Sequence, residues 1–553
     1  MSDQAVNVSL PSDLLFRPVA ADHRLALSRS RAHSLLLLWA FGAVVIFAFL
    51  GLPSSTRTQE ARILETAREL LGAPFEQWML PHVNGHLRMQ KPPLAYWLTA
   101  ASYKAFGVGE AAGRLPAALA AWLTIGLVMR FARELFGRAA AFYAGATMLG
   151  TLFFARFSRL AETDILGMLF VSAGAYAVFR FARSSEAGES PGKAILWCHL
   201  SALAMAAGLM VKGPIAFYPA LVLLALCAVE RRWSLLKRYL TSGALLTLLA
   251  IGCPWFLYVA FRPGSEALAA DLENSVRGGK GHWDLPHVYI PSLATLLLPW
   301  TGVVALALWA AGRRFRRDAR LRFLLIWALA ILIPLCFWGN KQKHYLLPLL
   351  PPLMLMAGWL LDRCLARGLR KGLVRKVILI SFGAFVAAGI AVPIASFAIR
   401  KHLLWQDCAA AGLFVVTSLV AVVLARRAGF GPAVKAFAVG NAFVLVAITA
   451  VWAPTFQPVD NDFVAKQIEG RYGRAPLAFF GKESLQLAWH LQRIIPICAT
   501  EAELEQQAAE SPGLVAINID SGSDDGVPAA VDVQLKFKDQ DGTTYYIGPV
   551  RQR

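Results

Sequence analysis

Apolar segments long enough to cross a membrane recur along most of this sequence, and they restrict the possible fold more than any other feature. The first, SLLLLWAFGAVVIFAFLGL at 34–52, contains no charged residue. A transmembrane helix needs about 20 apolar residues to cross a hydrocarbon layer of about 30 Å. The segment is too long for the core of a signal peptide, so we interpret it as an uncleaved transmembrane helix.

The composition also indicates a polytopic membrane protein. Hydrophobic residues make up 57% of the 553 positions and charged residues only 16%, whereas soluble domains contain about 25% charged residues. We therefore expect an α-helical polytopic membrane protein with about 13 transmembrane helices. The predicted helices are 33–53, 110–130, 138–158, 163–183, 195–211, 214–229, 239–260, 289–311, 322–339, 345–362, 376–398, 409–425 and 434–453.

The net charge of +20 could suggest binding to nucleic acid, but the basic residues are distributed as in a membrane protein. They occur in short loops, for example 130–138, 231–238 and 313–322, which alternate with less basic loops. This alternation is the positive-inside pattern. It predicts a cytoplasmic N-terminus, an outer C-terminus, the lipid bilayer as a partner, and no nucleic-acid partner.

Charged residues in the segments assigned to the outer face run against this bias and so favour a binding role. Lys212 lies at the end of an apolar segment, where an unpaired ammonium is costly and is usually functional. Several apolar segments bring lysines and a few carboxylates to this one boundary, which suits a lipid that carries phosphate. These outer segments are 54–109, 156–164, Lys212, 261–288, 339–345 and the residues after about 454.

Residues 54–109 predict two helices that lie on the membrane surface. Apolar side chains at 63–71 recur at helical spacing, and Gly72 is a typical helix end. A second helix is expected after Pro92-Pro93. Lys91 would then lie beside a helix N-terminus, where backbone N–H groups already favour an anion. We expect Lys91 to bind phosphate; the alternative is a lysine that only reaches the lipid headgroups.

The order of these motifs resembles that of the GT-C membrane glycosyltransferases in the protein O-mannosyltransferase-like superfamily. The similarity is greatest to the lipid A 4-amino-4-deoxy-L-arabinose transferases, and it covers roughly residues 33–363. The matching motifs are QEARILETAREL at 59–70, Pro81-His82, Gly85, Lys91-Pro92-Pro93, Tyr96-Trp97, Asp164, Lys212-Gly213-Pro214 and KQKHY at 341–345.

The resemblance implies a glycosyltransferase of the bacterial inner membrane that acts at the periplasmic face. The implied reaction moves 4-amino-4-deoxy-L-arabinose from undecaprenyl phosphate to a phosphate of lipid A, with inversion at the sugar. We expect the protein to be a monomer. Two alternatives stay open. One is a protein O-mannosyltransferase-like enzyme with a hydroxyl acceptor. The other is a lipid transporter, which the absence of an inverted repeat in the predicted helices disfavours.

Candidate site residues follow from the resemblance and from the charges on the outer face. The expected catalytic residues are Glu60, Asp164 and Lys91. The expected substrate-binding residues are Arg62, His86, Arg88, Tyr96, Arg159, Lys212, His282, Lys341, Lys343 and Tyr345.

The sequence departs from the family at the first position of its opening motif. The family's aspartate corresponds to Gln59 and its tyrosine to Ile63. Glu60 is the expected substitute for the aspartate. The loss is tolerable if the acceptor is a lipid phosphate, because a phosphate is already anionic and needs little help from a base, unlike a hydroxyl.

The expected chemistry requires no cofactor, although a divalent metal is possible. The candidate metal ligands are His82, His86 and His282. His82 and His86 have the spacing that places two ligands on one face of a helix. The alternative is a pair of solvated histidines in a loop.

The chain changes character after the last apolar segment. Residues 1–453 are predicted to form the transmembrane catalytic domain, and 454–553 a small periplasmic α/β domain. Strands are expected at PLAFFG, GLVAIN and VQLKFKDQDGTTYYIGPV, the last folded as a hairpin at Asp541-Gly542, and helices at ESLQLAWHLQRI and EAELEQQAAE. Cys498 is the single cysteine of this region, so no internal disulfide is expected.

Overall fold

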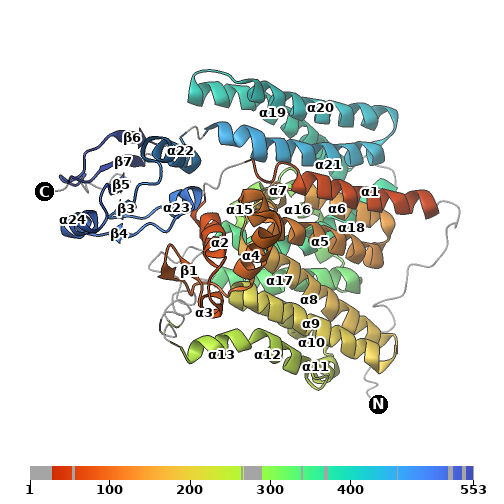
Figure 1. The fold of residues 1–553 in the computed structure, drawn as a ribbon. Coiled ribbons are helices and arrows are strands. Elements are labelled where there is room, and N and C mark those ends of the chain that lie inside the picture. Colours follow the sequence, from red (N-terminus) through yellow and green to blue (C-terminus); the bar gives the residue numbers. More distant parts are fainter. Residues whose placement is uncertain are drawn as a thin grey trace, which may run out of the picture.

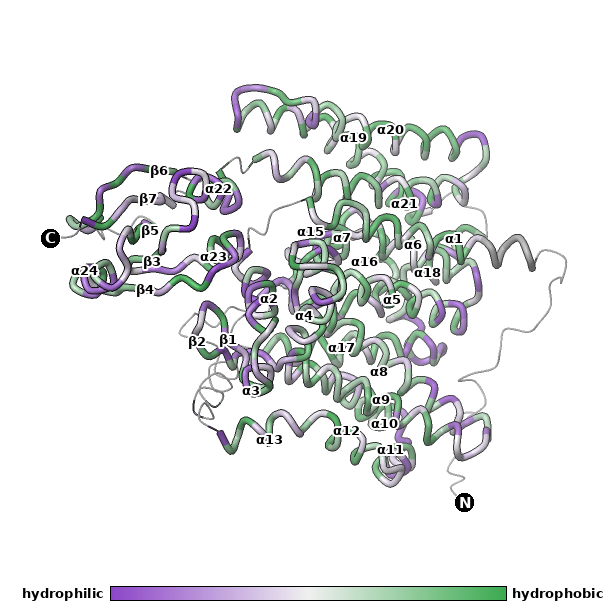
Figure 2. Tube along the Cα trace, in the orientation of Figure 1, coloured by the Kyte–Doolittle hydropathy of each residue, from purple (hydrophilic) through white to green (hydrophobic). Residues whose placement is uncertain are grey.

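The computed structural model describes residues 28–52, 57–262, 266, 269, 289–337, 341–366, 372–456, 459–520, 527–538 and 543–551, and side chains from residue 34 onward. A bundle of helices forms the larger part, and a small α/β domain lies at one end of it (Figure 1). Apolar residues run along the bundle helices, whereas hydrophilic residues occur in the α/β domain, in the segment between the two parts and at the ends of the bundle helices (Figure 2).

The described part of the bundle contains eight helices that are long and apolar enough to cross a membrane, or ten if two bent helix pairs are counted. The predicted number of 13 is therefore not confirmed. The segments predicted at 195–211 and 214–229 form one continuous unit of 40 residues, Pro191–Glu230. The segment predicted at 289–311 contains two helices that meet at 118°. Breaks and bends of this kind are invisible to a count of apolar residues.

The bundle helices follow one another in chain order. They are α1 (Ser28–Phe47), α5 (Glu110–Phe136), α6 (Arg138–Leu149), α7 (Leu152–Phe157), α8 (Thr163–Glu186), α9 (Pro191–Lys212), η3 (Gly213–Phe217), α10 (Tyr218–Glu230), α11 (Trp233–Leu240), α12 (Ala244–Gly252), α13 (Pro254–Ala260), α15 (Tyr289–Leu296), α16 (Thr301–Gly312), α17 (Ala319–Phe337), η5 (Lys343–Leu349), α18 (Leu350–Ala366), α19 (Leu373–Arg400), α20 (Trp405–Arg427), α21 (Phe430–Ala447), η6 (Ile448–Trp452) and η7 (Ala453–Phe456).

Close contact between small residues holds the centre of the bundle together. A Cβ atom added at Gly358 of α18 would lie 2.6 Å from the backbone oxygen of Ala140 and 2.8 Å from the Cβ of Ala144, both in α6. Helices in membranes associate through such small residues, because lipid gives no hydrophobic drive between apolar helices. The sequence therefore fixes α6 against α18 by the absence of a side chain.

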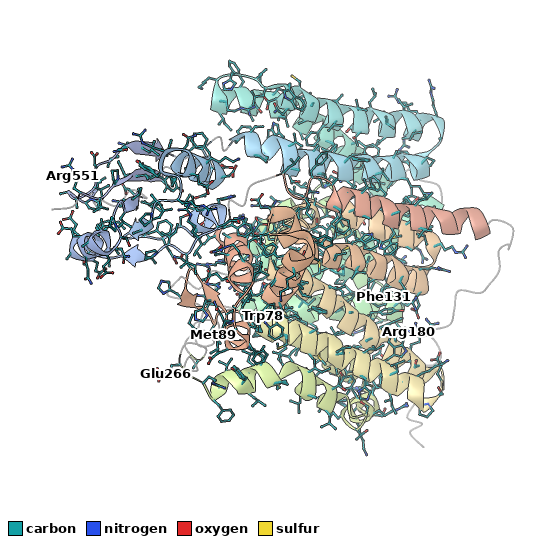
Figure 3. All side chains as sticks on the ribbon, in the orientation of Figure 1. Trp78, Met89, Phe131, Arg180, Glu266 and Arg551 are labelled. Atoms are coloured by element: carbon teal, nitrogen blue, oxygen red, sulfur yellow. The ribbon has the colours of Figure 1, made fainter. Side chains whose placement is uncertain are left out.

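The direction of α8 relates one end of the bundle to the predicted topology. Helix α8 starts at Thr163 near the α/β domain and ends near Arg180 and Arg183. Figure 3 shows Arg180 at the opposite end of the bundle from Met89. Glu134 accepts a hydrogen bond of 2.5 Å from Arg183 and forms an ion pair with Arg180 at 3.5 Å. A loop predicted to be cytoplasmic thus lies at the end that is distant from the α/β domain.

A folded segment separates the bundle from the α/β domain. It contains α2 (Thr58–Glu69), α3 (Phe75–Met79), the hairpin strands β1 (His82–Val83) and β2 (His86–Leu87), and α4 (Leu94–Phe106). The two predicted surface helices correspond to α2 and α4. After the end of α2 the chain turns at Gly72, whose φ of +80° favours glycine. The sequence did not predict α3 or the hairpin.

The α/β domain is built on a five-stranded sheet with the order β4-β3-β5-β7-β6. Strand β3 pairs parallel with β4 and β5, whereas β7 pairs antiparallel with β5 and β6. The strands and helices predicted from the sequence are confirmed; α22 and β4 were not predicted, and Asp541-Gly542 lies outside the described residues. The elements are α22 (Asn461–Tyr472), β3 (Leu477–Phe480), α23 (Leu485–Leu491), β4 (Ile497–Cys498), α24 (Glu501–Glu510), β5 (Val515–Asp520), β6 (Leu535–Lys538) and β7 (Thr544–Pro549).

Candidate functional site

A polar cavity of about 200 Å³ lies where the α2–α4 segment meets the bundle. One wall comes from α2 and from the chain between β2 and α4. The facing wall comes from the start of α8, the end of α9 and η5. The lining residues are Gln59, Arg62, Ile63, Arg88, Gln90, Lys91, Tyr96, Glu162, Thr163, Asp164, Lys212, Gln342, His344 and Tyr345.

Ends of bundle elements deliver the polar residues of the bundle wall. Helix α8 begins at Thr163 and places Asp164 in its first turn. Helix α9 ends at Lys212, because Gly213 has a φ of +66° and Pro214 cannot continue the helical hydrogen bonds. Polar side chains are tolerated at such positions, since they lie at the edge of the apolar core rather than in its middle.

Lys212 and Asp164 form a buried ion pair in this wall. The Lys212 ammonium donates a hydrogen bond to Oδ1 of Asp164, and each side chain is 7% exposed. The ammonium also lies 4.6 Å from the ring centroid of Tyr345, a cation–π distance. Each charge thus holds the other in a fixed place on the cavity wall.

Arg62 and Arg88 place two guanidinium groups on the opposite wall. Arg88 donates to the hydroxyl of Tyr96 at 3.3 Å and to Oε1 of Gln90 at 3.0 Å, and both of these partners are neutral. The Nε of Arg62 is buried and has no hydrogen-bond partner in the described structure. Burial, followed by the charge of Arg88, lowers the pKa of Arg62. An anion that enters the cavity would offset these effects, because a nearby negative charge stabilises the charged form of an arginine.

Lys91 joins the same wall between β2 and α4. It lines the cavity and lies three residues before Leu94, the first residue of α4. The first turn of that helix has backbone N–H groups without partners inside the helix. The place expected for Lys91, next to a helix N-terminus, is therefore the place the structure gives it.

Glu162 lines the cavity but was absent from the expected site residues. Its side chain is 4% exposed and lies 3.1 Å from Nη1 of Arg57. Burial raises the pKa of Glu162 to about 7, because the opposing effect of Arg57 is smaller and the nearby Asp164 and Glu60 add to the increase. Glu162 lies two residues before Asp164 in the sequence, and this proximity to an expected site residue could have identified it.

Glu60 does not line the cavity. Its carboxylate accepts hydrogen bonds of 2.8 and 3.1 Å from Arg114 of α5 and one of 2.9 Å from the backbone N–H of Ala161. Both charged side chains are 1% exposed. Adjacent helical residues point about 100° apart, so Gln59 and Ile63 face the cavity while Glu60 joins α2 to the bundle behind it.

Arg159 also lies behind the cavity rather than in its wall. Its guanidinium donates to the backbone oxygens of Val45 and Ile46 at 3.0 and 3.1 Å, and to that of Ala48. These are carbonyl groups at the C-terminal end of α1, which lack partners within the helix. Burial lowers the pKa of Arg159 to about 10. Arg159 thus secures α1.

Other expected residues lie near the cavity without lining it. Lys341 is buried and Lys343 is exposed, whereas Gln342 and His344 line the cavity. His86 is exposed on β2. Gln342, His344 and Tyr345 of this segment therefore line the cavity, whereas its two lysines do not.

The candidate metal ligands do not converge. In the hairpin, His82 is paired with Leu87 and Val83 with His86. Paired residues share a face of a two-stranded sheet, so His82 and His86 point to opposite faces. His282 lies outside the described residues. Within the ranges that the structure describes, no group of three or more His, Cys, Asp or Glu side chains is arranged to hold a metal ion.

Comparison with known proteins agrees with the motif resemblance. Residues 90–258 match the family model described as dolichyl-phosphate-mannose-protein mannosyltransferase. The undecaprenyl phosphate-alpha-4-amino-4-deoxy-L-arabinose arabinosyl transferase of Pseudomonas aeruginosa is 30% identical over 354 residues, 62% of each chain. The protein of the same name from Edwardsiella ictaluri is 29% identical over 330 residues, 57% of each chain. The similarity thus spans about three-fifths of these relatives.

Solved structures extend the similarity to nearly the whole fold. The apo crystal structure of ArnT from Cupriavidus metallidurans superposes with a TM-score of 0.74 at 22% identity, covering 94% of this chain and 98% of that one. The form bound to undecaprenyl phosphate gives 0.74 at 21% identity, covering 93% and 98%. This chain therefore has the GT-C fold of ArnT, and its residues 90–258 carry the sequence pattern of the dolichyl-phosphate-mannose-protein mannosyltransferases.

Proposed function

We propose that this protein is an inner-membrane glycosyltransferase that moves 4-amino-4-deoxy-L-arabinose from undecaprenyl phosphate to a phosphate of lipid A at the periplasmic face. The names of its relatives and its fold support the choice of reaction. The observation that carries the proposal is the cavity itself, in which Arg62, Arg88 and Lys91 face Lys212 at one end of the bundle. This arrangement suits a reaction with phosphate on both sides of the transferred sugar.

The proposed step transfers the sugar between two phosphates. An oxygen of the acceptor phosphate forms a bond to the anomeric carbon, and the bond from that carbon to the oxygen of undecaprenyl phosphate breaks with its electron pair. The acceptor phosphate is already an anion, so no proton has to be removed before it attacks, and the leaving group departs as a phosphate anion. Fixed cations accelerate such a step by stabilising charge on both phosphates and by aligning them. We assign this task to Arg62, Arg88, Lys91 and Lys212.

The carboxylates of the cavity are proposed to handle the sugar. Asp164 is oriented by Lys212, and Glu162 lies near it on the same wall. Positive charge develops on a sugar at the transition state, and carboxylates stabilise it. They would also attract the sugar's ammonium group. Gln59 occupies the position of the family's aspartate, so Glu162 and Asp164 supply the negative charge among the lining residues. Glu60 lies behind the cavity and acts as a positioning residue.

One observation favours a second candidate, transfer to a hydroxyl acceptor. A hydroxyl needs a general base, and an effective base has a pKa near the working pH. The pKa of Glu162, raised to about 7, meets that requirement.

A reconstituted transfer reaction tests both candidates. The purified full-length protein in liposomes would receive undecaprenyl-phosphate-linked aminoarabinose with either lipid A or a serine- and threonine-containing peptide. We expect mass spectrometry to find lipid A heavier by one aminoarabinosyl group, and unmodified peptide. Modified peptide with unmodified lipid A would replace the first proposal by the second. No product from either acceptor would contradict both.

A further inference from the structure

The tip of the β1–β2 hairpin is bonded to the α/β domain through one side chain. The amide nitrogen of Asn84 donates to the backbone oxygen of Ile495 at 2.9 Å, and its amide oxygen accepts from the backbone N–H of the same residue at 2.8 Å. Asn84 is 3% exposed. The amide nitrogen also donates to Oε2 of Glu483 at 3.1 Å. A buried asparagine that is satisfied in this way fixes both partners, because losing either side leaves polar groups unpaired.

The same turn is bonded to α2 on its other side. The carboxylate of Glu69 accepts from the backbone N–H groups of Asn84 at 2.5 Å and of Gly85 at 3.2 Å. Asn84 and Gly85 have φ angles of +50° and +76°, values that Asn-Gly turns of hairpins adopt readily. The turn is therefore held between α2 and the α/β domain in one conformation.

Apolar contacts surround this bonded turn. Trp489 of α23 stacks on Tyr103 of α4, with ring centroids 6.0 Å apart and an interplanar angle of 12°. Trp489 is 2% exposed and belongs to one buried cluster with Leu64 of α2. Figure 1 shows α23 beside α2. The α/β domain is thus docked on the α2–α4 segment by a continuous interface rather than tethered by its linker.

The hairpin leads directly into the cavity wall. Strand β2 ends at Leu87, and Arg88, Gln90 and Lys91 follow. The backbone N–H of Arg88 is bonded to the oxygen of Pro81 at 2.8 Å, so the two ends of the hairpin are also tied together. A shift of the turn is therefore transmitted to the residues that carry the cationic groups.

We propose that the α/β domain is a positioning element of the cavity, and that Asn84 is the residue through which it fixes the strand bearing Arg88, Gln90 and Lys91. Asn84 is a positioning residue, since it does not line the cavity. The inference rests on the proposed function only for its transfer measurement, because the conformation of the hairpin can be followed without substrate.

The test uses Asn84→Gly in the full-length protein. Glycine tolerates the φ of +50°, so the substitution removes the side-chain bonds without straining the turn. The matched control is Gln492→Gly, which removes an exposed amide side chain at a φ of +51° in the α/β domain. If Asn84→Gly does not accumulate, Gly85→Ala replaces it, because its Cβ would lie 3.3 Å from Ile494 and strain a φ of +76°.

Two measurements give the result. Hydrogen exchange followed by mass spectrometry should show faster exchange at 82–91 in Asn84→Gly, with unchanged exchange in β3 and β5. The transfer rate should fall by about ten- to a hundredfold, the loss typical of displaced catalytic groups, mainly in kcat, while Gln492→Gly changes neither quantity.

Unchanged exchange at 82–91 would overturn the proposal, as would faster exchange with an unchanged transfer rate. If the wild-type protein transfers no sugar, the proposed function fails, and the exchange measurement alone still decides whether the α/β domain fixes the hairpin.

Discussion

Arg62 lies on α2 and Arg114 is paired with Glu60 of α2, but the two guanidinium groups differ in how completely they are hydrogen-bonded. Arg114, in the joint behind the cavity, donates to both oxygens of Glu60 and to the backbone oxygen of Leu50. Arg62, in the cavity wall, keeps a buried Nε without a partner among the described residues, and the nearby Arg88 repels it. A fully paired buried charge holds elements together, whereas an incompletely paired one is available to a ligand.

The same contrast applies to the carboxylates. Glu60 accepts three hydrogen bonds and is enclosed by α2, α5 and the turn before α8. Glu162 forms an ion pair with Arg57, and burial still raises its pKa to about 7. We therefore expect substitutions in the joint to reduce stability, and substitutions in the cavity wall to reduce activity.

The largest effect is expected from Glu60→Ala. It would leave Arg114 buried without its carboxylate, which typically destabilises a protein by about 3–5 kcal/mol. Thermal unfolding of the purified protein in detergent should show a large decrease in Tm. Glu60→Gln, which keeps an acceptor oxygen, should lose less. A normal Tm combined with lost transfer in Glu60→Ala would instead place Glu60 in catalysis.

Lys91→Ala should remove most transfer without reducing stability. Losing a charged donor to a reacting phosphate costs about 2–4 kcal/mol, a rate decrease of roughly 30- to 1,000-fold. Lys91→Arg should keep part of the rate, since the charge remains while the donor geometry changes. Polymyxin survival of cells lacking their own transferase, with expression level and Tm as controls, measures the effect. Full function of Lys91→Ala would mean that this lysine only reaches the headgroups.

Glu162 should make transfer depend on pH. Its pKa of about 7 means that the charged form falls from about nine-tenths at pH 8 to about one-tenth at pH 6. If the charged form handles the sugar, the wild-type rate decreases about tenfold over that interval as the pH falls. Glu162→Gln should be slower at pH 8 and nearly independent of pH. An equal slope in both proteins would assign the dependence to another group.

Gln59→Asp should have the smallest effect. A lipid phosphate acceptor needs no general base, so restoring the family's aspartate is expected to change the transfer rate less than about threefold. Gln59→Glu is the control for side-chain length. A large gain in rate from Gln59→Asp would favour a hydroxyl acceptor.

The sequence could predict much of the cavity because its residues lie at element ends. Lys91, Asp164 and Lys212 could be placed at one boundary from hydropathy and loop charge alone. Glu60 and Arg159 could not be separated from the cavity residues, since that required the rotational phase of α2 and the position of the end of α1. The sequence Asn84-Gly85 is typical of a hairpin turn. The spacing of His82 and His86 also fits a helix, and the sequence alone did not decide between the two structures.

The number of transmembrane helices was harder to predict for a different reason. Hydropathy measures the length of apolar segments but not their direction. The helical pattern is interrupted at Gly213, yet α9, η3 and α10 together form one candidate membrane span. By contrast, α15 and α16 meet at 118°. Neither outcome follows from the number of apolar residues on each side of the break.

The central claim, that the cationic side chains of the cavity hold a lipid phosphate, is tested most directly by ligand-dependent thermal unfolding of Arg62→Met. Undecaprenyl phosphate should raise the Tm of the wild-type protein, and undecaprenol, which lacks the phosphate, should not. Arg62→Met should unfold without lipid at a Tm no lower than that of the wild type and should lose most of the rise. An equal rise in both proteins, or an equal rise with undecaprenol, would contradict the claim.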